Sequence, residues 1–108
     1  MPNDVVWETT GPDGTKVVLR QSTVDARERM NKHPGPDHMT VDEARFTVEE
    51  AQVIQQSMSR PGRQSYYRYQ EELGKPPYMR TTVALNSESE EETTAVAISW
   101  GRQSNTSR

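Results

Sequence analysis

Arg60-Pro-Gly-Arg-Gln-Ser-Tyr-Tyr-Arg-Tyr69 is the stretch at which the spacing of side chains changes from a helical period to a period of two. Three of the four tyrosines and three of the ten arginines lie within these ten residues. Alternation predicts a strand over Gln64–Gln70, with Ser65, Tyr67 and Tyr69 on one face and Tyr66 and Arg68 on the other.

The chain after this stretch continues to alternate. Tyr78–Asn86 and Thr93–Trp100 are expected to be strands, joined by the acidic loop Ser87–Glu92. Along the last strand, alternation predicts Ala95, Ala97 and Ser99 on one face and Val96, Ile98 and Trp100 on the other. Together with Gln64–Gln70, these two segments predict an antiparallel three-stranded meander.

The N-terminal part begins with a hairpin signal. Val5–Thr10 and Lys16–Arg20 flank Gly11-Pro-Asp-Gly14, in which proline presets one turn torsion and glycine allows a positive φ. A helix is expected over about Val24–Lys32, and the prolines in His33–Asp37 end it.

The middle of the chain is open to two interpretations. Thr40-Val-Asp-Glu43 and Thr47-Val-Glu-Glu50 each match a capping box, so residues 41–59 form one helix or two. We favour a short irregular piece followed by a firm helix from about Val48 to Ser59. The predicted fold is α+β: an N-terminal hairpin, two or three helices, then the three-stranded meander with the helices packed on one face. A single domain is expected over residues 1–101, with a flexible polar tail over 102–108.

Composition excludes several classes of protein. The chain has no cysteine, which excludes disulfides and thiolate sites. Its net charge is −3, and only 31% of its residues are hydrophobic. No apolar run has membrane-spanning length and no signal peptide is recognisable, so a cytoplasmic protein without membrane contact is expected. The negative charge, much of it in the acidic cluster of Glu88 and Glu90–Glu92, requires any nucleic-acid contact to be local.

Metal and cofactor sites are not expected. His33 and His38 lie five residues apart across a proline-rich loop with Asp37 as the only near carboxylate, whereas zinc normally takes three or four ligands from rigid elements. The consecutive pairs Glu49-Glu50 and Glu71-Glu72 point apart and form no carboxylate dyad.

Arginine, tyrosine and histidine remain as candidate site residues. Guanidinium groups donate to phosphate, a tyrosine ring stacks on a base, and histidine transfers protons near neutral pH. These are the groups that metal-free RNA cleavage through the 2′-hydroxyl needs. The ordinary alternative is that the tyrosines fill a small core and the arginines extend into water.

Several short strings resemble the barnase–EndoU–colicin–RelE-like superfamily of small ribonucleases, in particular its phage- and toxin-associated branch. They are Lys16–Arg20 with Ser22-Thr23, His33-Pro34, Thr47–Ala51 through Ser59–Pro61, Tyr66–Arg68 and Ala95–Trp100. The resemblance implies a metal-independent endoribonuclease, often a toxin with a cognate antitoxin, whose active site lies on the concave face of the sheet. The chain lacks the histidine that members often carry in the first helix, and Ser99 stands where threonine is more usual.

On this hypothesis His33 is the acid or base, Arg68 and Arg80 clamp the phosphate, and Tyr67 stacks or donates a proton. Arg27 provides a second phosphate contact, and Arg63, Tyr66 and Ser99 complete the binding set. Two alternatives stay open. A non-enzymatic module on the same scaffold would bind a protein through Trp7, Trp100 or the tyrosine strand. A homodimer would complete its core by pairing edge strands.

Overall fold

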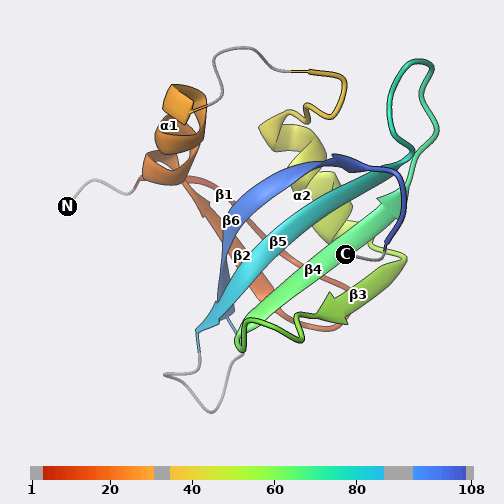
Figure 1. Cartoon of the computed structure of the whole chain (residues 1–108). Helices are drawn as coiled ribbons and strands as arrows, with labels where there is room; N and C mark the ends of the chain where they lie inside the picture. Colours follow the sequence, from red (N-terminus) through yellow and green to blue (C-terminus); the bar gives the residue numbers. More distant parts are fainter. Residues whose placement is uncertain (1–3, 31–34, 87–93, 107–108) are drawn as a thin grey trace.

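A six-stranded mixed sheet forms the frame of the protein (Figure 1). The computed structural model describes residues 4–30, 35–86 and 94–106. The strands are β1 (Val5–Thr10), β2 (Lys16–Arg20), β3 (Val53–Gln56), β4 (Arg63–Tyr69), β5 (Tyr78–Asn86) and β6 (Thr94–Gln103). The helices are α1 (Gln21–Met30) and α2 (Val41–Glu49).

The strand order β1-β2-β6-β5-β4-β3 corrects the predicted architecture. The sheet has six strands and the described residues contain two short helices, where a three-stranded meander with two or three helices was expected. The N-terminal hairpin joins the meander because β2 pairs in parallel with β6, through Lys16–Val18 and Thr94–Val96. All other neighbouring strands are antiparallel. A parallel pair needs a long crossover, which here is the whole chain from α1 to β5.

The prediction of a helix over Val48–Ser59 is wrong. The first capping box is the one that forms: the Thr40 hydroxyl accepts from the Glu43 N–H, and the Glu43 carboxylate accepts from the Thr40 N–H. Thr47, in the second box, lies inside the helix, and its buried hydroxyl donates to the Glu43 carbonyl. The helix ends at Glu49, and Val53–Gln56 pair with β4 as an edge strand. Ladder hydrogen bonds and β-branched side chains favour the strand over the helical spacing.

The sheet curls around α2, so the helix contacts β1 as well as β4 and β5 (Figure 1). The concave face therefore carries the hydrophobic core. Twelve buried side chains form it: Trp7, Val17, Leu19, Met39, Ala44, Val48, Tyr66, Met79, Val83, Ala95, Ala97 and Trp100. The resemblance implies an active site on the concave face, but α2 fills that face.

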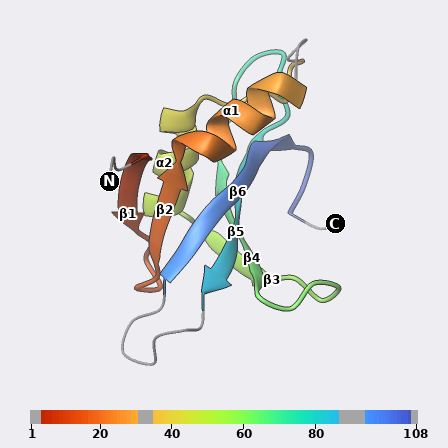
Figure 2. The same cartoon turned by 90° about the vertical axis from the view of Figure 1, so that its left-hand side faces the viewer.

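The first helix lies across the ends of β2 and β6 (Figure 2). None of its residues is buried, and Val24 packs against the edge of the core. Near this helix, β6 continues to Gln103, beyond the expected end of the domain at residue 101. Arg102 is among the buried residues.

Candidate functional site

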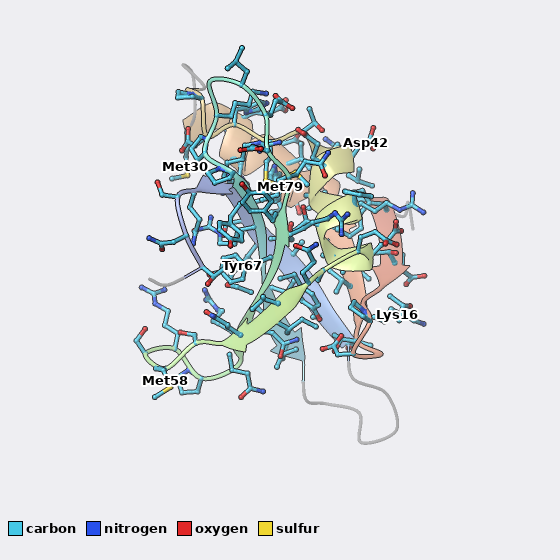
Figure 3. The ribbon with its side chains drawn as sticks, turned by 90° about the vertical axis from the view of Figure 1, so that its right-hand side faces the viewer. Lys16, Met30, Asp42, Met58, Tyr67 and Met79 are labelled. Carbon is cyan, nitrogen blue, oxygen red and sulfur yellow. The ribbon has the colours of Figure 1, made fainter. Side chains whose placement is uncertain are left out.

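The face of β4, β5 and β6 that points away from α2 carries four of the eight predicted site residues, namely Arg63, Tyr67, Arg80 and Ser99. The strand register arranges this face in four rows across the three strands, taken in the order β4, β5, β6. The rows are Arg63–Ala84–Val96, Ser65–Thr82–Ser99, Tyr67–Arg80–Gly101 and Tyr69–Tyr78–Gln103. We call this surface the open face. Figure 3 shows Tyr67 on the side of the strands opposite α2, whose first turn contains the labelled Asp42.

The rows of the open face contain no acidic residue, in a chain whose net charge is −3, and the Glu71 carboxylate approaches only the Tyr69 end. None of the twelve residues in its four rows is acidic, and two of them are arginines. Acidic side chains lie elsewhere, for example on α2 and in the loop between β4 and β5. The predicted acidic cluster between β5 and β6 falls outside the described residues. The rows therefore form a local patch of hydrogen-bond donors with positive charge.

Arg80 lies at the centre of the open face, directly opposite Tyr67 and Gly101 in the ladders. Its Nη1 donates to the Gln103 Oε1 at 3.1 Å, and its buried Nε has no hydrogen-bond partner among the described residues. Tyr67 is only 5% exposed, so its ring is not a free stacking surface. Beside this pair the hydroxyls of Ser65 and Thr82 are hydrogen-bonded at 2.9 Å, and Ser99 is the next residue in that row.

Arg27 reaches the same region from α1. Its guanidinium lies 4.5 Å from the centre of the Trp100 ring, and its Nη2 donates to the Trp100 carbonyl at 2.8 Å. Burial lowers the pKa of Arg27, and the nearby charge of Arg80 lowers that pKa further. Two of the predicted phosphate-binding arginines are therefore electrostatically close, although they come from separate elements.

Tyr69 and Tyr78 occupy the row at the other end of the open face. Their rings make an edge-to-face contact with centroids 5.2 Å apart. Tyr69 is 44% exposed and offers the accessible ring that Tyr67 lacks. The negative charge of Glu71 raises the pKa of the Tyr69 phenol. A carboxylate therefore lies near this end of the open face. Alternation already placed Tyr69 beside Tyr67, and that signal could have identified it as a site residue.

A cavity of about 140 Å³ borders the opposite end of the open face. Its lining includes Arg60 and Arg63, the hydroxyl-bearing residues Ser57, Ser65, Tyr67 and Thr82, and two glutamines of β3. None of the described residues in this lining is acidic. The loop over residues 57–62 covers one side of it, and Figure 3 shows Met58 on that loop, on the same side of the sheet as Tyr67.

A second cavity of about 340 Å³ lies between α1 and residues 37–41. Trp100, Met39 and Val24 form much of its apolar wall, and Arg27, Asp37 and His38 bring charge or proton-transfer capacity to it. His38 was not among the predicted catalytic residues. His33, the predicted acid or base, falls outside the described residues.

Two predicted site residues lie away from the open face. Arg68 is on the α2 side of β4, where its Nη1 donates to the Glu50 carbonyl at 2.9 Å and its guanidinium lies 5.1 Å from the centre of the Phe46 ring. It therefore cannot join Arg80 in one phosphate clamp, and its contacts are structural. Tyr66 is fully buried, and its hydroxyl bonds with Asp13 and Gln64. The ordinary alternative holds for Tyr66, which is a core residue.

The tryptophans are not available as anchors for a protein partner. Trp7 is 6% exposed and donates its indole N–H to the Val41 carbonyl, and Trp100 is 7% exposed beneath Arg27. The predicted binding module that uses these two rings is therefore not supported by their position.

Within the described part of the chain, no group of three or more potential metal ligands is found. The helices described there are all too short or too polar to cross a membrane. Comparison of the chain with family models, with curated proteins and with solved structures gave no match.

Proposed function

We propose that this protein binds single-stranded RNA on the open face of β4, β5 and β6. The carboxylate-free set of rows carries the proposal, because it is a cationic, donor-rich surface on an acidic chain. Arg63 and Arg80 donate to phosphates, the Ser65–Thr82–Ser99 row donates to backbone oxygens, and the exposed ring of Tyr69 stacks on a base.

The described residues supply two parts of a metal-free cleavage site. Arginines can stabilise the charge of the transition state, and the Tyr67 hydroxyl can transfer a proton. The proton acceptor for the 2′-hydroxyl is the third part, and no carboxylate or imidazole is present in the four rows. Cleavage with His33 as this acceptor remains a prediction. It is tested below on the same protein–RNA mixtures that are used to measure binding.

The test compares matched double variants that each remove two positive charges. Arg63→Gln/Arg80→Gln removes the charge of the open face. Arg20→Gln/Arg45→Gln is the control, because Arg20 and Arg45 lie off this face and pair with Asp4 and Glu49. Binding is measured by fluorescence anisotropy with a labelled, hydroxyl-ended RNA of mixed sequence.

We expect the open-face variant to bind at least about tenfold more weakly than wild type. The slope of log K against log salt should fall by about 1.4, since each phosphate contact on a single strand contributes about 0.7. An equal loss in both variants would show non-specific charge attraction and would reject this face.

Incubation of the same mixtures in EDTA, followed by a gel, tests cleavage. If wild type binds the RNA tightly and the RNA stays intact, the protein binds RNA without cleaving it.

A further inference from the structure

The cavity that contains Arg60 and Arg63 differs from the rest of the open face in charge and in enclosure. Both arginines line it, and neither guanidinium has a hydrogen bond or an ion pair among the residues that the structure describes. A pair of arginines that lines a cavity together with hydroxyl-bearing residues, with no anion beside them among the described residues, has the composition of an oxyanion site.

The local backbone fixes the two arginines relative to each other. The Arg63 N–H donates to the Arg60 carbonyl at 3.1 Å, and the Ser57 N–H donates to the Arg63 carbonyl at 2.9 Å. The Ser57 hydroxyl accepts from the Arg60 N–H at 3.0 Å. Gly62, with φ at +84°, permits the tight turn between them. Binding an anion therefore requires ordering of the two side chains but little ordering of the backbone.

We propose that this cavity binds the terminal phosphate monoester of an RNA strand, an inference that rests on the proposed function. The charge of the two arginines matches a monoester, which carries nearly two negative charges at neutral pH, better than it matches an internal diester. The volume of about 140 Å³ is below the roughly 300 to 1,000 Å³ of sites that enclose a whole small molecule. The phosphate alone enters, and the nucleotides extend over the open face.

The position of the cavity suits the end of an RNA chain better than its middle. It lies against β3, the last strand of the sheet, together with β4 and β5, and Ser57 and Arg60 of the loop over residues 57–62 line one side of it. An internal phosphate needs an exit for the chain in both directions. The remaining lining residues offer further donors for the outer oxygens of the phosphate: the Ser57, Ser65 and Thr82 hydroxyls, the Tyr67 phenol and the amide of Gln55, which pairs with Ser65.

The experiment compares RNA of one sequence with hydroxyl ends, with a 5′-phosphate and with a 3′-phosphate. Wild type is expected to bind one phosphorylated form at least about tenfold more tightly than the hydroxyl form, which is the effect of one charge-assisted hydrogen bond. Arg60→Gln should reduce this ratio to within about twofold of unity, and it should fold normally because Arg60 is exposed. Arg45→Gln, on α2, should leave the ratio unchanged.

A titration with inorganic phosphate, followed by amide NMR shifts in residues 57–65, separates the two proposals. If hydroxyl-ended RNA binds and terminal phosphates add nothing, the phosphate site is wrong and RNA binding stands. If inorganic phosphate shifts these amides in wild type but not in Arg60→Gln, while no RNA binds, the site stands and the proposed function is wrong. Equal phosphate shifts in wild type and Arg60→Gln would overturn the site itself.

Discussion

Tyr66 was predicted to bind a ligand, but its contacts stabilise the fold. Its hydroxyl accepts from the Gln64 side chain at 3.0 Å and donates to Asp13 in the β1–β2 turn at 3.2 Å. Its ring lies so close to Gly11 that a Cβ there would be 2.9 Å from the ring carbon Cε2. Tyr66 therefore joins the N-terminal hairpin to β4, residues that lie more than 50 positions apart in the sequence.

Tyr66→Phe is expected to cost about 1 to 2 kcal/mol of the free energy of unfolding, because Asp13 and Gln64 lose a buried partner. Burial raises the pKa of the Tyr66 phenol. A raised pKa contributes stability that is complete below the unfolded value of about 10 and is lost as pH rises through the folded value. Urea unfolding between pH 8 and 10.5 should therefore show a smaller alkaline loss in Tyr66→Phe than in wild type. Tyr78→Phe is the matched control, and an equal change in both variants would contradict this role.

At the scale of single elements, local signals located β1, β2, β4 and β5 well but failed where pairing decides the structure. The β5–β6 register passes from Thr82–Ser99 to Val83–Ala97, which leaves Ile98 without a partner and forms a bulge. The bulge shifts the alternation by one residue, so Trp100 joins Ala95 and Ala97 in the core and Ser99 lies on the open face. Simple alternation had predicted the reverse for Ser99 and Trp100.

The capping box of α2 gives a prediction at this scale. Thr40→Ala should destabilise the protein by about 1 kcal/mol, because the N–H of Glu43 loses its acceptor at the start of the helix. Thr40→Ser keeps the hydroxyl and should lie close to wild type. Thermal unfolding followed by circular dichroism measures both variants. A Thr40→Ala protein as stable as wild type would mean that the cap contributes nothing, and α2 is then held by its packing alone.

For the whole molecule, the last residues of β6 join parts of the chain that are distant in sequence. The Arg102 side chain is fully buried, and its Nη1 donates to the carbonyls of Gln70 and Pro76 at 2.9 and 3.0 Å. Its Nη2 lies 3.8 Å from the Glu43 carboxylate of α2 and 3.6 Å from the Glu72 carboxylate. The Arg102 N–H also donates to the Asp37 carbonyl.

Two truncations test this role. A chain that ends after Gln103 should unfold within a few degrees of the full chain, because it keeps every strand. A chain that ends after Trp100 should lose at least about 3 kcal/mol, since Glu43, Glu72 and two carbonyls lose a buried cation. Thermal unfolding compares the two with the full chain. Equal midpoints for both truncations would show that the domain ends at residue 101, as the sequence predicts.

The sequence by itself determined the features that depend on neighbours along the chain. These are the Gly11–Gly14 turn, the alternating strands on either side of residues 70–77 and the two faces of β4, whereas the choice between the capping boxes at Thr40 and Thr47 was not among them. Only the tertiary structure decided that β2 pairs with β6, that residues 53–56 form a strand, and that Arg63 and Arg80 share a face which Arg68 does not. The physical reason is that strand pairing and burial gain their free energy from residues far apart in sequence, and the spacing of side chains along one segment carries no record of its partner.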